Sequence, residues 1–441
     1  MTSAGRRLGT AVHLAAGLGV LGAAGYAYVA VVGHVLDRPD EAAALSALIS
    51  LYLLVNMIGP GVYAALEQET SRAVSAACAR GESLRPIARR SAVLALWSLL
   101  GLVAAVLVGW PLLLGPVLEG RPGLLAALVV AIAGSAGVYW ARGMLGGQQR
   151  FAEYARTLYV EGAVRLLPCL VLLGLAVGAP EAYGLAFAVG SAVAALSVAP
   201  ALRLKPSTEP AGQVTGMGRG LWYLTMAIAL GQLLANLAPV IVSYRLPGDP
   251  VLAAVFGTTF VLARIPLFLF APVQAVLLPK LTRAATLGAH DELSRRLRQA
   301  VTLVAGLGLL GVLGCVLFGP WAAELLFNAA VRPTAGTLAL LGAATLVMMV
   351  ALVIQPTLVA MGRQRQVTVA WALGAVVFLA VLVAPVHPVA AALVAQLVGP
   401  GVVLVVLGFG VVRALRAANR TTGLDTVGDR LTTQAVDTEG P

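Results

Sequence analysis

The stretch Val301–Phe318 reads VTLVAGLGLLGVLGCVLF and contains no charged residue. A helix needs about 20 predominantly apolar residues to cross a bilayer, and similar runs recur along the whole chain, Leu124–Ala133 (LLAALVVAIA) among them. These runs are continuous, whereas the strands of a membrane barrel alternate apolar and polar residues. The sequence therefore predicts an all-α, polytopic membrane protein.

The composition excludes several other classes. Of the 441 residues, 59% are hydrophobic and only 11% are charged, and the mean hydropathy is +0.91. Soluble domains have about 25% charged residues, so a soluble enzyme or a disordered chain is excluded. The three cysteines, Cys78, Cys169 and Cys315, are widely spaced and match no metal or disulfide pattern. We expect no metal and no cofactor.

Charges, prolines, glycines and polar clusters divide the chain into about twelve spans. The predicted spans are 10–35, 42–66, 90–114, 123–145, 157–178, 182–202, 219–243, 251–277, 301–321, 335–360, 366–384 and 388–412. If the N-terminus is cytoplasmic, 24 of the 30 Lys and Arg residues fall in cytoplasmic segments and 4 in outer loops. Because Lys and Arg concentrate in cytoplasmic loops of membrane proteins, both termini are predicted to be cytoplasmic. The net charge of +11 then mostly reflects the Lys and Arg residues that set the orientation in the membrane, which argues against a nucleic-acid partner.

The sequence also contains an internal repeat of six spans. Four pairs of short elements recur at offsets of 211, 210, 215 and 212 residues: Arg72 with Arg283, Gly109-Trp-Pro with Gly319-Pro-Trp, Gly147-Gln-Gln-Arg150 with Gly362-Arg-Gln-Arg365, and Pro60 with Pro272. Units with an even number of spans face the same way in the membrane. We therefore expect an N-terminal lobe (1–202), a cytoplasmic linker (203–218), a C-terminal lobe (219–416) and a disordered cytoplasmic tail (417–441). Two lobes around a cavity are typical of transporters.

Charged residues inside spans are costly and therefore indicate function or pairing. Glu161 and Arg165 lie four residues apart on one helix face. They either neutralise each other or line a cavity. Arg264 has no acidic residue four positions away and precedes Pro266. Since guanidinium groups match phosphate oxygens, Arg264 indicates an anionic ligand, with a cavity water or a distant acid as the alternative.

Uncharged polar residues extend this set. Asn56 lies in the second span, and Gln232 and Asn236 share a face of the seventh. They either line a cavity or form hydrogen bonds between helices. Pro60 frees a carbonyl in the preceding turn, and glycines on both sides permit bending. We expect gating or cytoplasmic-end roles for four residues: Arg72, Arg283, Pro60 and Pro272.

Three segments resemble one known family. They are Leu262–Phe270 with Val276–Arg283, Ala64–Arg72, and Gly147–Phe151. The chain resembles the polysaccharide-biosynthesis and lipid-flippase branch of the multidrug/oligosaccharidyl-lipid/polysaccharide (MOP) exporter superfamily. The resemblance implies alternating access, a basic central cavity, and flipping of polyprenyl-diphosphate-linked sugars. Arg264 matches the cavity arginine of the branch that flips the cell-wall precursor, although it stands nearer to the following proline. Twelve spans, where that branch usually has fourteen, favour a general oligosaccharide flippase.

The sequence thus predicts a non-enzymatic flippase for a lipid-linked saccharide in the cytoplasmic membrane. Its partners would be that saccharide, membrane lipid and glycan-synthesis enzymes. One alternative is a cation-coupled drug or small-molecule antiporter of the same superfamily. A further alternative is a non-transporting membrane scaffold of a glycan-synthesis complex.

Overall fold

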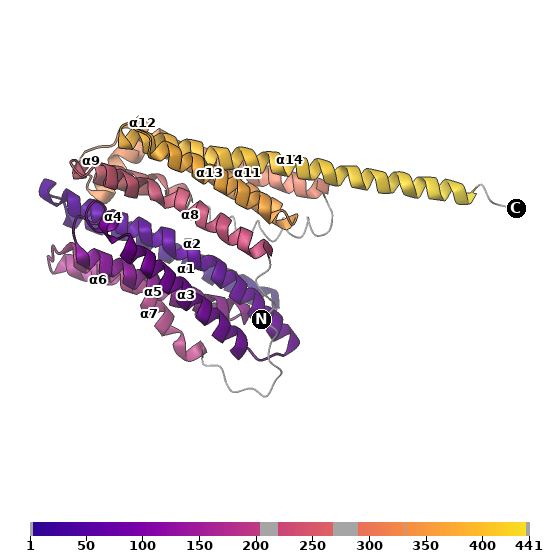
Figure 1. The fold of residues 1–441 in the computed structure, drawn as a ribbon, viewed down its shortest axis with the longest axis horizontal. Coiled ribbons are helices and arrows are strands. Elements are labelled where there is room, and N and C mark those ends of the chain that lie inside the picture. Colours follow the sequence, from indigo (N-terminus) through magenta and orange to yellow (C-terminus); the bar gives the residue numbers. More distant parts are fainter. Residues whose placement is uncertain (1–2, 203–218, 268–289, 330, 438–441) are drawn as a thin grey trace.

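The computed structural model describes residues 3–202, 219–267, 290–329 and 331–437, and every regular element in these ranges is a helix (Figure 1). The N-terminal half contains α1 (Ser3–Val35), α2 (Ala42–Arg80), α3 (Arg85–Val108), α4 (Trp110–Leu114), α5 (Pro122–Gly147), α6 (Phe151–Gly174) and α7 (Pro180–Ser197). The C-terminal half contains α8 (Arg219–Arg245), α9 (Pro250–Ala263), α11 (His290–Phe327), α12 (Ala335–Ala360), α13 (Gln364–Leu382) and α14 (Pro388–Asp437). Short 3-10 turns lie at Pro39–Glu41 and Ala199–Leu202.

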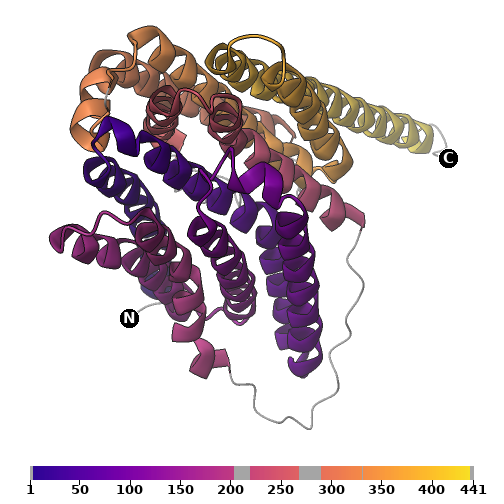
Figure 2. The same cartoon turned by 60° about the vertical axis from the view of Figure 1, so that its left-hand side comes forward.

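Equivalent helices pack together in the two halves. The indigo-to-magenta half and the red-to-yellow half lie beside each other in two views (Figures 1 and 2). In the first half α1 packs on α6, α5 on α7, and α6 on α7. In the second, α8 packs on α13, α12 on α14, and α13 on α14. The six-span repeat of the sequence therefore recurs as a repeated set of helix pairs.

The turn between the fourth and fifth membrane-spanning helices of each unit, α5 to α6 and α12 to α13, repeats in detail. Gln149 and Gly362 both have positive φ, 57° and 73°. The N–H of Arg150 donates to the carbonyl of Leu145, and that of Arg363 to the carbonyl of Leu358, both at 2.9 Å. The structural offset is 363 − 150 = 213 residues. The sequence pairing of Arg150 with Arg365 was therefore wrong by two residues, because the turn geometry and not the shared letters sets the register.

Eleven helices in the described ranges are long and apolar enough to cross a membrane. The predicted span that is not among these eleven is 182–202, which corresponds to α7, whose 18 residues begin with Pro180 and Glu181. These two residues lower its mean hydropathy. The protein is thus an all-helical, multi-pass membrane protein. The run quoted above forms the lipid-facing surface of α11, where Leu310 is 66% and Phe318 is 63% exposed.

Three boundaries differ from those expected. α2 continues 14 residues beyond the expected end of the second span, to Arg80 (80 − 66 = 14). α9 ends at Ala263, in the middle of the expected eighth span. α14 continues to Asp437, where we expected a disordered tail from 417. Residues 417–437 include no proline, so the backbone hydrogen bonds of α14 can continue past the apolar span.

The two halves are in contact near the predicted outer ends of their helices. The hydroxyl groups of Ser46 on α2 and Ser243 on α8 are 2.8 Å apart. Gly33 on α1 lies so close to the Phe327 carbonyl of α11 that an added Cβ would be 2.2 Å from its oxygen. Gly257 on α9 also lies close to Ile49 on α2, where an added Cβ would be 2.8 Å from that side chain. Small residues thus allow the outer ends to close.

The native cysteines test the orientation. Cys78 is exposed near the end of α2 that we place in the cytoplasm, whereas Cys169 and Cys315 are buried. A membrane-impermeant maleimide should therefore label Cys78 in inverted vesicles and not in intact cells or right-side-out vesicles. A matched variant, Cys78→Ser with Ala179→Cys at the exposed start of α7, should show the reverse. Labelling of Cys78 from outside would contradict the orientation.

Candidate functional site

A cavity of about 370 Å³ lies between the two halves. Its walls come from α1, α2, α5 and α6 on one side and from α8, α9 and Leu267 on the other. The polar and aromatic lining residues are Tyr26, Tyr52, Asn56, Ser135, Tyr139, Arg142, Glu161, Arg165, Gln232, Asn236, Phe260 and Arg264. The cavity therefore combines aromatic rings with charged groups at the junction of the repeats.

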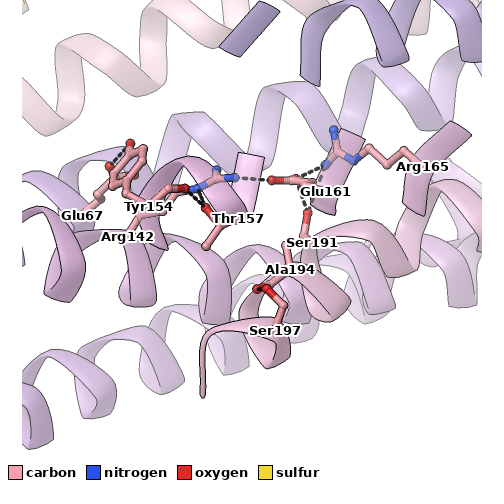
Figure 3. A network of polar contacts seen from close by, with 9 residues as sticks. All are labelled: Glu67, Arg142, Tyr154, Thr157, Glu161, Arg165, Ser191, Ala194 and Ser197. Carbon is pink, nitrogen blue, oxygen red and sulfur yellow. Dashed lines mark hydrogen bonds and ion pairs between the residues drawn. The ribbon is translucent and has the colours of Figure 1, made fainter. Parts of the chain in front are cut away.

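A buried ion-pair network forms the N-terminal wall (Figure 3). The carboxylate of Glu161 lies 2.5 Å from Nη2 of Arg142 and 2.6 Å from Nη2 of Arg165. All three side chains are less than 10% exposed. Two positive charges thus share one negative charge. The predicted pair of Glu161 and Arg165 is confirmed, and it also lines the cavity, so the two interpretations offered for it hold together.

Hydroxyl groups complete this network. Ser191 on α7 donates to Oε1 of Glu161 at 2.6 Å and accepts from Nη2 of Arg165 at 3.0 Å. Nε of Arg142 donates to Thr157 at 2.9 Å. Each carboxylate oxygen and each guanidinium group at the centre therefore has at least one partner, although Nε of Arg165 is buried without one among the described residues. Pairing of this kind is what allows charges to be buried.

The chain makes room for this network with small residues. Glu161 and Arg165 are one turn apart on α6, and α7 crosses them at Gly190. A Cβ at Gly190 would lie 2.5 Å from Cγ of Arg165. The ring of Phe187 lies 4.6 Å from the guanidinium carbon of Arg165, which favours a cation–π contact. Close packing of α6 on α7 therefore fixes the direction of Arg165.

Arg264 forms the opposite wall with a different kind of partner. Its Nη2 donates to Oε1 of Gln396 on α14 at 2.7 Å, and Nε2 of Gln396 donates to the Leu234 carbonyl of α8 at 2.9 Å. The guanidinium carbon lies 4.7 Å from the centre of the Phe260 ring. Nη1 of Arg264 is buried and has no hydrogen-bond partner among the described residues. The partners of this arginine are thus neutral.

The break in α9 places Arg264 at the cavity. The helix ends at Ala263, and Arg264 is its C-cap residue. Pro266 has no N–H, so it cannot donate to the Leu262 carbonyl one turn earlier, and its ring disfavours a continuous helix. Val261, Arg264 and Leu267 face the cavity from the two sides of this break. A proline in the sequence therefore positions a cation within the membrane-spanning region.

All six predicted substrate-binding residues line this one cavity: Asn56, Glu161, Arg165, Gln232, Asn236 and Arg264. Asn56 donates to the Tyr52 carbonyl at 2.8 Å, and Asn236 donates to the Gln232 carbonyl at 3.0 Å. These amides bond within their own helices, so the expected hydrogen bonds between helices are not what holds them.

The predicted gating residues are distributed differently. Pro60 lines the cavity, and α2 remains helical on both sides of this proline. Arg72 lies on the surface and pairs with Glu69 at 2.7 Å. Pro272 and Arg283 lie outside the described residues.

Arg142 and Gln396 are among the residues of the site that were not predicted. Arg142 was counted with the cytoplasmic basic residues, although the predicted span 123–145 contains it; it lies within α5 and is 4% exposed. That assignment was wrong, because α5 extends to Gly147 and Arg142 bonds to Glu161 across the helix pair. Gln396 was missed because nothing in the sequence shows which helix α14 faces. Within the described residues, no group of His, Cys, Asp and Glu side chains could hold a metal ion.

Comparisons with known proteins identify the fold. No family model matches the chain, and no curated protein matches it. Solved structures do match. The chain is similar to an inward-facing multidrug resistance MATE family transporter of the MOP superfamily, with 15% identity, a TM-score of 0.68, and 90% of this chain and 96% of that chain covered. The outward-facing form of such a transporter gives a TM-score of 0.60 at 13% identity, covering 93% and 96% of the two chains.

A MOP superfamily transporter from Pyrococcus furiosus is also similar, with 14% identity and a TM-score of 0.60 over 93% of this chain and 96% of that one. Its structure is described as having a binding pocket of reverse polarity that suggests a different function. The present chain therefore has the fold of MOP superfamily transporters. At these identities the comparisons show the fold and leave the branch of the superfamily open.

Replacing the shared carboxylate should destabilise the protein. Glu161→Gln leaves two buried arginines without a counter-charge, and breaking a buried pair typically costs about 3–5 kcal/mol. The matched control is Glu153→Gln, which removes a pair with Arg150 whose side chains are 34% and 32% exposed. A surface pair contributes about 0–1 kcal/mol. Thermal unfolding of the purified proteins should separate the two variants, and equal melting temperatures would contradict the assigned role of Glu161.

Proposed function

We propose that this protein moves an anionic lipid-linked saccharide, of the polyprenyl-diphosphate class, across the membrane by alternating access. The observation that supports this most is the charge of the cavity. Among its described lining residues are three arginines and one glutamate. Glu161 offsets only one of these positive charges. A diphosphate would offset the remainder through charge-assisted hydrogen bonds.

Arg264 is the group that best suits the diphosphate. Its Nη1 is a buried donor without a partner among the described residues. Leaving a buried donor unpaired costs about 1–3 kcal/mol, which a ligand oxygen would recover. Its side-chain acceptor among the described residues, Gln396, holds no charge. An anion therefore meets an intact positive charge at this wall, and the sequence resemblance assigns Arg264 the same role.

A second cavity suits an apolar chain. It has a volume of about 280 Å³ and lies between α2, α3 and α8, with Val62, Leu66 and Leu94 among its lining residues. The two cavities are neighbours: Gly61 lines the second one, and an added Cβ there would be 3.4 Å from the side chain of Gln232, which lines the central one. A lipid could thus place its headgroup in the charged cavity and its chain in the neighbouring apolar one.

The contacts between the halves support an inward-facing state. Ser46 with Ser243, Gly33 with Phe327 and Gly257 with Ile49 all lie at ends that the charge distribution places outside. In alternating access the same cavity must next open outward, which requires these contacts to separate.

The same charge argument bears on the alternative functions. A cation-coupled antiporter for cationic drugs would need to attract cations, and an excess of arginine in the cavity repels them. A scaffold without transport would have no use for an unpartnered donor in a membrane cavity. Both remain outcomes of the experiments that follow.

The charge of Arg264 should be required for transport. Arg264→Gln keeps polar contacts and removes the cation, so substrate affinity should fall about tenfold or more. The measurement is the amount and leaflet of lipid-linked saccharides in a deletion strain that expresses each variant at equal level. Wild type and Arg332→Gln, which alters an exposed outer pair, should clear the cytoplasmic leaflet. Clearance by Arg264→Gln at the wild-type rate would contradict the diphosphate site, and drug resistance without glycan change would favour the antiporter.

Locking the outer contact should stop transport. In the double variant Ser46→Cys, Ser243→Cys the two sulfurs replace hydroxyl groups that are 2.8 Å apart, within reach of a disulfide. Oxidation should abolish transport and reduction should restore it, whereas either single variant should respond to neither treatment. Full transport by the oxidised double variant would contradict alternating access at this interface.

A further inference from the structure

We propose that Gln396 is a specificity-determining residue, which holds the guanidinium group of Arg264 in place with a neutral acceptor and so keeps its charge available for an anionic headgroup. This inference rests on the proposed function. It concerns a residue that does not line the central cavity and that no feature of the sequence distinguishes.

The position of Gln396 is fixed on both sides of its amide. The side chain is 1% exposed. Oε1 accepts from Nη2 of Arg264 at 2.7 Å, and Nε2 donates to the Leu234 carbonyl at 2.9 Å. Since Nε2 is held by a backbone acceptor, the amide cannot rotate to present its donor to Arg264. The oxygen therefore always faces the arginine.

This contact orients the other half of the guanidinium group. The group is planar and its donors are arranged in a fixed fork. With Nη2 bound to Gln396 and the group lying over the Phe260 ring, the direction of Nη1 is set as well. Arg264 lines the cavity, and Nη1 has no partner among the described residues. Gln396 thus holds the Nη1 donor of Arg264 in a fixed direction.

A comparison with the opposite wall shows why the acceptor is neutral. There, Glu161 lies within 2.6 Å of both Arg142 and Arg165 and offsets part of their charge. A carboxylate in place of Gln396 would neutralise Arg264 in the same way. The amide gives the same geometry without the charge. The two halves therefore differ, and the C-terminal half has the arginine with a full charge.

The test compares two substitutions of Gln396. If its role is structural, the variant that loses more hydrogen bonds should bind the diphosphate less well; if it determines specificity, the variant that adds a negative charge should. Gln396→Glu keeps the acceptor but adds a negative charge, and Gln396→Leu removes both hydrogen bonds but adds no charge. The full-length purified protein is titrated with radiolabelled farnesyl diphosphate, and farnesol competes in parallel. Inorganic diphosphate as a second competitor separates a lipid ligand from a soluble one.

Gln396→Glu should lower the affinity for farnesyl diphosphate about tenfold, as Arg264→Gln does, because the introduced carboxylate neutralises the arginine. The affinity for farnesol should not change. Gln396→Leu should melt at a lower temperature than Gln396→Glu, yet should keep more of the preference for the diphosphate over the alcohol. The matched control is Gln355→Glu, which replaces a glutamine that accepts from Trp371 at 2.8 Å, and it should bind like wild type.

The possible failures are distinct. If wild type binds farnesyl diphosphate no better than farnesol, the proposed function is wrong. If wild type prefers the diphosphate and Arg264→Gln does not, but Gln396→Glu keeps the preference, then this inference alone is wrong. Should Gln396→Glu fail to fold, Gln396→Leu decides, because complete loss of the preference in that variant would also overturn the inference.

Discussion

The N-terminal half depends on one interaction, the ion pairing of the Glu161 carboxylate with both Arg142 and Arg165. Charges within the membrane are tolerated when they are paired and hydrogen-bonded, and here Ser191 and Thr157 supply further partners. The three charged residues come from α5 and α6, and Ser191 comes from α7. The network therefore ties three helices together and leaves a net positive charge beside the cavity.

The repeat gives both halves the same helix packing, but the two walls of the cavity are chemically different. The N-terminal wall is a rigid network of shared charges. The C-terminal wall presents Arg264, at the break in α9, against the neutral amide of Gln396. A site that combines an excess of positive charge with aromatic and apolar surface fits a molecule that is anionic at one end and apolar at the other. This match connects the fold, which is shared with drug transporters, to a different proposed substrate.

Much of the fold could be predicted from the sequence. Apolar runs such as Val301–Phe318 correspond to helices because length and hydropathy are what a bilayer selects. Glu161 and Arg165 could be found because charges are rare in spans, and Arg264 because it also lacks a nearby acid. All of these residues do line the same cavity.

What could not be predicted depends on contacts between helices distant in sequence. Arg142 lies near the end of α5, where sequence alone cannot separate a loop arginine from a buried one. Gln396 is 132 residues from Arg264, and only the packing of α14 against α8 and its bond to Arg264, at the end of α9, give it a role. The two-residue error in the repeat register arose for a similar reason, because the turn is defined by Gln149 and Gly362 and not by matching letters.

The central claim is that the basic cavity between the halves binds the diphosphate of a lipid-linked saccharide. The most direct measurement is an experimental structure of the full-length protein in lipid nanodiscs with a polyprenyl-diphosphate-linked saccharide added. The account predicts density for the diphosphate within hydrogen-bond distance of Nη1 of Arg264, facing Arg165. An empty cavity under conditions in which the lipid binds elsewhere on the protein, or a headgroup that avoids Arg264, would contradict it.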